Sequence, residues 1–72
     1  MSKIQSVLFN KILWTTSKAR DWLEKNDLTR IKKVDITKEF LRYRIRQPGM
    51  FKKFRSINVK GVKGVRFIIG FL

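Results

Sequence analysis

The chain has 72 residues and contains neither cysteine nor histidine, which excludes disulfide bridges, thiol or imidazole catalysis and zinc sites of the finger type. Eighteen lysine and arginine residues stand against five aspartate and glutamate residues, so the formal net charge is +13. A hydrophobic content of 43% is sufficient for a folded domain rather than a disordered basic tail. We therefore expect one small, strongly basic domain, covering residues 1–72.

The first expected elements are a strand and a helix. Residues 6–9 form a short, largely apolar run, which predicts a strand near residues 5–10. Thr15 is a suitable helix N-cap, because its hydroxyl can accept a hydrogen bond from an unpaired backbone N–H. The helix is expected over residues 15–26, with an apolar face formed by Ala19, Trp22 and Leu23. Trp22 on this face favours a role in the core over a role in stacking on a ligand.

A strictly alternating segment follows in the middle of the chain. Leu41, Tyr43 and Ile45 alternate with Arg42, Arg44 and Arg46. A period of two predicts a strand with one apolar face and one face of arginines, spaced roughly 7 Å apart. We expect this strand to belong to a segment over residues 34–47, although residues 37–39 could equally form a turn. The arginine face fits either a solvated sheet surface or a surface that meets a polyanion.

The remaining elements are a short helix and a last strand. Pro48 ends the long strand and suits the first position of a helix, which predicts a short helix over residues 48–55 with Phe51 and Phe54 in the core rather than free for base stacking. Residues 58–64 alternate glycine and lysine, as in a plain surface turn or a loop that wraps a phosphate. The final strand is expected over residues 64–71.

Together, these elements predict an α+β fold. We expect a small, largely antiparallel sheet of about three strands packed on one helix, plus a short second helix. The sequence does not determine the order of the strands.

The pattern resembles a small uncharacterised domain that is common in large double-stranded DNA viruses and tailed phages. The matching residues span nearly the whole chain: residues 6–9, Trp14 and Thr15, Ala19, Trp22 and Leu23, residues 43–47, Phe51, Phe54 and Arg55, Gly64 and Val65, and residues 69–71. Where such domains usually carry a His-Gly pair after the helix, this chain has Asn26 and Asp27. The resemblance implies a viral setting, in a virion or the interior of a host cell, and no known enzymatic activity.

The charge distribution points to a binding function. Residues 30–72 contain thirteen basic and two acidic residues, and the few carboxylates are scattered, so we expect no enzyme, no metal site and no cofactor. No stretch is apolar enough for a membrane span, and no secretion signal is evident. A folded, basic domain suits binding to nucleic acid, to an anionic membrane or to an acidic protein.

We therefore expect binding of nucleic acid without sequence specificity, in a role such as viral genome packaging or condensation. Double-stranded DNA is favoured as the ligand by the resemblance alone. The expected contact residues are Arg42, Arg44, Arg46, Lys52, Lys53, Arg55, Lys60, Lys63 and Arg66. The alternatives are a structural virion protein, held by acidic capsid surfaces or by self-association through an edge strand, and a protein that binds membrane surfaces.

Overall fold

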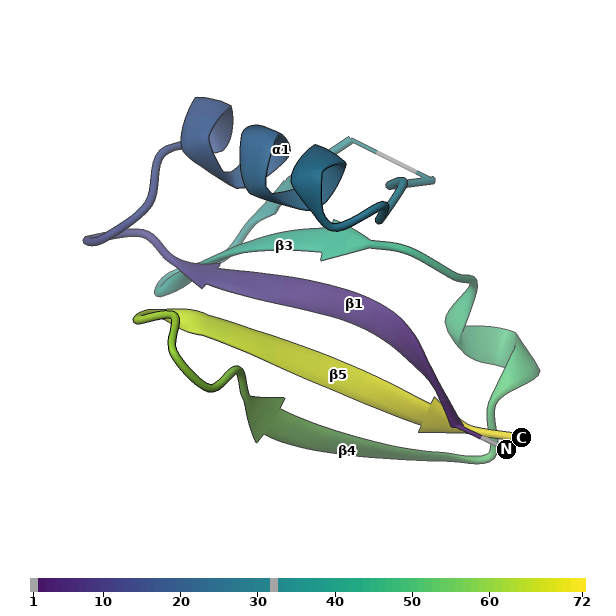
Figure 1. The fold of residues 1–72 in the computed structure, drawn as a ribbon. Helices are drawn as coiled ribbons and strands as arrows, with labels where there is room; N and C mark the ends of the chain where they lie inside the picture. The colour runs from purple at the N-terminus through teal and green to yellow at the C-terminus, as the bar shows by residue number, and fades with distance from the viewer. Residues whose placement is uncertain (1, 32) are drawn as a thin grey trace.

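The structure, a computed structural model, describes residues 2–31 and 33–72. Its elements in chain order are β1 (Ser2–Asn10), α1 (Thr16–Lys25), β2 (Asp35–Ile36), β3 (Phe40–Arg44), a 3-10 turn (Pro48–Met50), β4 (Lys53–Asn58) and β5 (Val65–Phe71). The five strands form one sheet in the order β2-β3-β1-β5-β4, and every neighbouring pair is antiparallel. The α1 helix lies on one side of this sheet (Figure 1).

The helix begins and ends where its sequence predicts. The Thr15 side chain accepts a hydrogen bond from the backbone N–H of Lys18 at 3.2 Å, which satisfies one of the free donors of the first turn. At the other end, the Asn26 side chain donates to the Trp22 carbonyl at 2.8 Å, and Asp27 adopts a positive φ of 55° that reverses the chain. The helix expected over residues 15–26 is thus confirmed.

The core lies between α1 and the sheet and is centred on Phe9, which is fully buried. The Phe9 ring meets three other aromatic rings, with centroids 5.0 Å from Trp14, 5.8 Å from Trp22 and 5.6 Å from Tyr43. Such edge-on and tilted pairs add to the stabilisation from apolar burial. The buried apolar residues around them are Val7, Ala19, Leu23, Leu41, Tyr43, Ile45 and Val65. Trp22 packs against this cluster, as the sequence predicts.

The predicted fold class was wrong in two respects: the sheet has five strands instead of about three, and no second α-helix is found in the part of the chain that the structure describes. The segment expected as one long strand over residues 34–47 is a hairpin of β2 and β3. Thr37 makes the turn, because its hydroxyl accepts from the Phe40 N–H at 3.0 Å and its own N–H donates to the Phe40 carbonyl at 2.9 Å. Residues 37–39 therefore form the turn that the sequence left open.

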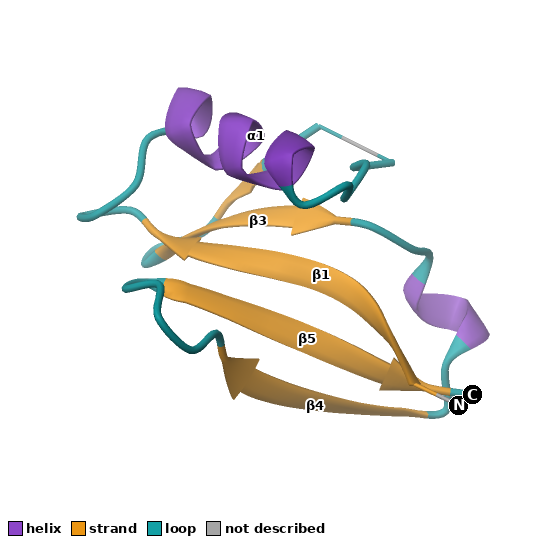
Figure 2. Cartoon of the chain, in the orientation of Figure 1, coloured by secondary structure: helices purple, strands orange, loops and turns teal. Residues whose placement is uncertain are grey.

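The short helix expected over residues 48–55 is limited to one 3-10 turn, after which the chain becomes extended and forms β4 (Figure 2). Phe51 accounts for this change of direction. Its ring occupies the space beside Gly70 on β5 that a Cβ atom at Gly70 would fill. The backbone N–H of Lys52 then donates to the Phe71 carbonyl at 2.8 Å. Pairing with β5 thus takes precedence over the helical spacing of the phenylalanines.

Candidate nucleic-acid interface

Within residues 2–31 and 33–72, no α-helix covers the side of the sheet opposite α1, and we call this side the open face. Pro48 and Phe51 lie against one part of it. The strand registers assign its residues. Val7 and Phe9 are buried under the helix, so Leu8 between them lies on the open face. Leu8 is paired with Arg42 on β3 and with Arg66 on β5. The open face consists of Ser6, Leu8, Asn10, Asp35, Phe40, Arg42, Arg44, Phe54, Ser56, Asn58, Arg66, Ile68 and Gly70.

Two arginines form the centre of this face. Arg42 and Arg66 lie on either side of Leu8, in one row across three adjacent strands. The Arg66 guanidinium lies 5.9 Å from the centre of the Phe40 ring, and its Nε donates to the Asn58 side chain at 3.2 Å. Neither contact neutralises the charge of Arg66, which has no carboxylate partner among the residues that the structure describes. The row therefore presents two positive charges, about two strand spacings or roughly 10 Å apart.

The next two arginines of the alternating segment, Arg44 and Arg46, make contacts within the protein that the alternation does not predict. Arg44 shares the open face with Arg42, but it forms an ion pair with Asp35 at 3.2 Å. Arg46 lies beyond the end of β3, and its guanidinium donates to the Ile4 carbonyl at 2.8 Å. The structure thus confirms that arginines and apolar side chains alternate across the two faces. Of the three arginines, only Arg42 keeps its full charge free of such contacts among the described residues.

The sheet separates the other predicted contact residues from this row. Lys53 and Arg55 on β4 are opposite Phe71 and Ile69, which share the helix side with Phe67, a neighbour of the core. Lys53 and Arg55 therefore lie on the side of the sheet opposite to Arg42. The remaining predicted residues are exposed outside the strands: Lys52 before β4, and Lys60 and Lys63 in the β4–β5 turn. The nine predicted residues therefore do not form a single patch.

A shallow hollow lies on the open face beside Arg42. It has a volume of about 300 Å³ and is lined by Gln5, Leu8, Arg42, Pro48, Phe54 and Ile68. The Nε atom of Arg42 is buried and has no hydrogen-bond partner within residues 2–31 and 33–72. By contrast, the Gln5 side chain makes two hydrogen bonds, because its amide nitrogen donates to the Arg46 carbonyl at 2.9 Å and its oxygen accepts from Ser6.

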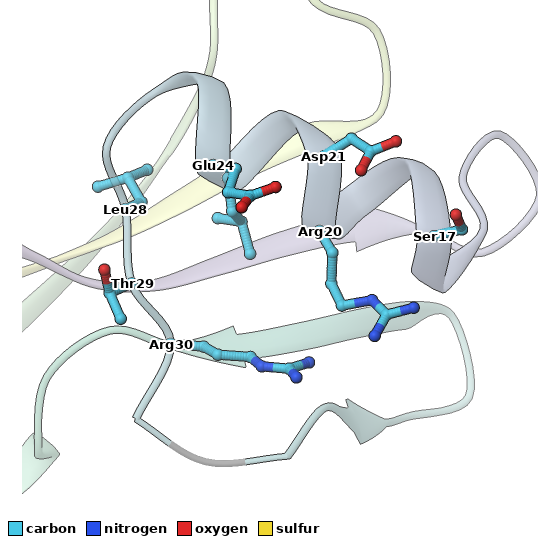
Figure 3. A pocket seen from close by; sticks show the side chains of 8 residues that line it. Ser17, Arg20, Asp21, Glu24, Leu28, Thr29 and Arg30 are labelled. Carbon is cyan, nitrogen blue, oxygen red and sulfur yellow. The ribbon is translucent and has the colours of Figure 1, made fainter.

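A second, larger hollow of about 470 Å³ lies beside α1, on the other side of the sheet. Figure 3 shows the side chains of Arg20 and Arg30 extending side by side beneath the helix. Asp21 and Glu24 also line it, so its charge is mixed. Close by, burial raises the pKa of the Tyr43 phenol above its usual 10.0, and the positive charges of Arg30 and Arg20 oppose this shift.

Sequence reasoning missed the apolar part of the open face. Phe54 was expected in the core of a short helix, yet its side chain lies on the open face and is 49% exposed. Phe40 and Leu8 were not considered as contact residues. One signal in the sequence indicated apolar residues on this face. Ile68 is two residues from Arg66 and so lies on the same side of its strand, which indicates that the face with the arginines also carries apolar side chains.

In the described ranges, no helix is long and apolar enough to cross a membrane, and no three acidic side chains are grouped as metal ligands would be. No family model, curated protein or solved structure matches this chain. The resemblance to the viral domain therefore stays a prediction.

Proposed function

We propose that this domain binds nucleic acid without sequence specificity, through its open face. The observation that carries the proposal is the row formed by Arg42, Leu8 and Arg66 across β3, β1 and β5. Asp35 is the single acidic residue among those that we assign to the open face, and Arg44 already neutralises it. The central arginines are therefore available to an external anion.

The chemistry of the row suits phosphate groups. A guanidinium group offers several N–H donors in a planar fork that matches two phosphate oxygens. Because the net charge is +13, long-range attraction would draw a polyanion to the domain and the release of counterions would drive binding. A broad sheet face has no protruding helix or ribbon to enter a groove and read base edges, which favours binding that is insensitive to sequence.

The viral resemblance supplies a biological setting for this proposal. Packaging or condensation of a genome requires neutralisation of phosphate charge in bulk, and a small basic domain is suited to that task. The alternative ligands of a basic surface are anionic lipid headgroups and acidic proteins. The open face favours nucleic acid over both, because it combines the arginines with the aromatic rings of Phe40 and Phe54.

A salt titration with three polyanions tests the proposal. Binding of the domain to DNA or RNA, to vesicles containing an anionic lipid and to polyglutamate is measured at increasing salt concentration. We expect the tightest binding to nucleic acid, with little difference between sequences and a log–log slope of roughly −3 to −6 for several phosphate contacts. Tighter binding to vesicles or polyglutamate, or binding confined to one sequence, would contradict the proposal.

A further inference from the structure

We propose that the hollow on the open face seats one unstacked nucleobase, so that the preferred ligand of the domain is a single strand. This inference rests on the proposed function and names its ligand class. The hollow lies between Arg42 on β3, Leu8 on β1, Ile68 on β5 and Phe54 on β4. The hollow therefore lies across four strands of the sheet, next to the row of Arg42, Leu8 and Arg66. The sugar–phosphate backbone of a bound nucleic acid would pass along this row.

The lining has the composition that a base requires. Leu8 and Ile68 are half-buried and come from the adjacent strands β1 and β5, so they give the hollow an apolar floor. Phe54 and Pro48 add an aromatic and an apolar wall. Bases are flat and largely apolar on their faces, and sites for single strands typically combine such surfaces with arginine.

Arg42 supplies the polar contact. Its Nε is buried beside the hollow without a hydrogen-bond partner in the part of the chain that the structure describes. Because the Nε atom is itself inaccessible, a base in the hollow would contact the outer N–H groups of the Arg42 guanidinium. Every nucleobase carries ring nitrogen or carbonyl acceptors on its edge, which a guanidinium group can contact. Gln5 and Arg42 are the polar residues of the lining, and Gln5 is fully buried and already hydrogen-bonded, so we assign the contact with the base to Arg42.

Phe54 is supported on one side by a buried ring. Its ring meets that of Phe51 edge-on, with centroids 5.9 Å apart. Phe51 is buried, and its ring is packed against the backbone of Gly70. The other side of Phe54 is exposed and offers a stacking surface to a base, and the contact with Phe51 reduces the conformational entropy that binding would cost.

A base in this hollow cannot remain within a double helix. In a duplex, each base is stacked on its neighbours and its Watson–Crick edge is paired, so its faces are not accessible to Phe54. A single strand presents its bases without that cost. The double-stranded DNA expected from the viral resemblance is the alternative ligand, and the following experiment separates the two.

The experiment compares three ligands of equal length: single-stranded oligothymidylate, the same sugar–phosphate strand without bases, and a duplex. We expect the whole domain to bind the strand with bases about tenfold more tightly than either of the others, at the same salt concentration. Equal, salt-dependent binding of all three, or tighter binding of the duplex, would overturn the binding of a base in the hollow and leave the proposed function intact. Failure to bind any of them would contradict both.

Two variants on one strand then locate the effect. Phe54→Ala removes the aromatic wall, and Ile57→Ala is the matched control, since Ile57 is similarly exposed (43% against 49%) and lies on the reverse side of β4. We expect Phe54→Ala to lose the preference for bases and Ile57→Ala to keep it. Melting curves of both variants show whether the fold persists. If the Phe54→Ala variant is folded and still prefers the strand with bases to the same degree, the hollow does not bind the base.

Discussion

Arg44 on β3 and Asp35 on β2 form an ion pair across neighbouring strands, with 3.2 Å between Nη2 and Oδ2. The two residues are diagonal neighbours on the open face, because Asp35 is opposite Arg42 in the register. Asp35 thereby places a negative charge at the edge of a surface that we propose for a polyanion. Since both side chains are partly exposed (30% and 56%), the pair contributes at most about 1 kcal/mol to stability.

We predict that Asp35→Asn tightens binding to nucleic acid, because it frees Arg44 and removes a repulsive charge from the open face. The matched control is Glu24→Gln, which makes the same charge change on the exposed surface of α1. Affinity at low salt is measured for both variants. An equal gain for the two would show that only the net charge matters and that the open face has no special part.

We also predict that Gly70→Ala destabilises the domain, because the added Cβ would overlap the ring of Phe51. Displacement of a packed ring typically costs about 1–3 kcal/mol. Gly49→Ala is the control, since a Cβ atom at Gly49 has no atom within 4 Å. Denaturant titration of the two variants measures the difference, and equal stability would indicate that Phe51 is not packed on Gly70.

Trp22→Ala is expected to lower the free energy of unfolding by about 3 kcal/mol or more, because Trp22 contacts both Phe9 and Phe67 across the core. The total stability of so small a domain is of the order of 5 kcal/mol, so this loss approaches global unfolding. Ile12→Ala, at a side chain that is 91% exposed, serves as the control. An unchanged melting curve for Trp22→Ala would contradict the packing of α1.

The stability of the domain should fall at alkaline pH because of Tyr43. Burial raises the pKa of this phenol above 10.0 in the folded state, so the folded state holds its proton at pH values where the unfolded state has lost it. The stabilisation is therefore complete below pH 10.0 and is lost as pH rises from there through the folded pKa. The Tyr43→Phe variant should lack this pH-dependent loss of stability. Measuring the free energy of unfolding of both proteins at a series of alkaline pH values tests this.

The same shift can be observed directly, because Tyr43 is the single tyrosine of the chain. Its near-ultraviolet absorbance reports ionisation of this one phenol. We expect the native protein to titrate at higher pH than the urea-unfolded protein. Coincident titration curves would show that the hydroxyl is not buried against the Thr16 carbonyl, to which it donates at 3.3 Å.

The sequence predicted those parts of the fold that depend on local pattern. The N-cap at Thr15 and the alternation around Tyr43 are set by neighbouring residues, and both are confirmed. The β4 strand was missed because the spacing of Phe51 and Phe54 also fits a helix. What decides between the two is distant in sequence: Phe51 packs on Gly70, and β4 pairs with β5.

The candidate site was predictable only in part, for the same reason. Alternation placed Arg42 and Arg44 on one face, and the structure agrees. Local pattern could not show that Arg46 is held by the Ile4 carbonyl, or that Lys53 and Arg55 lie on the reverse side of the sheet. Those facts depend on strand order and register, which arise from pairing between distant segments.

The most direct test of the central claim is the salt dependence of nucleic-acid binding in two double variants of equal charge. Arg42→Gln with Arg66→Gln removes the row on the open face, and Lys53→Gln with Arg55→Gln removes two charges from the reverse side of the sheet. We predict that the first variant loses most of its affinity, whereas the second changes far less. The log–log slope of the first variant should become shallower by about 1.8 on duplex DNA, or roughly 0.9 per phosphate contact, and by about 1.4 on a single strand, or roughly 0.7 per contact. Equal losses in two variants that both melt cooperatively would contradict a binding site on the open face.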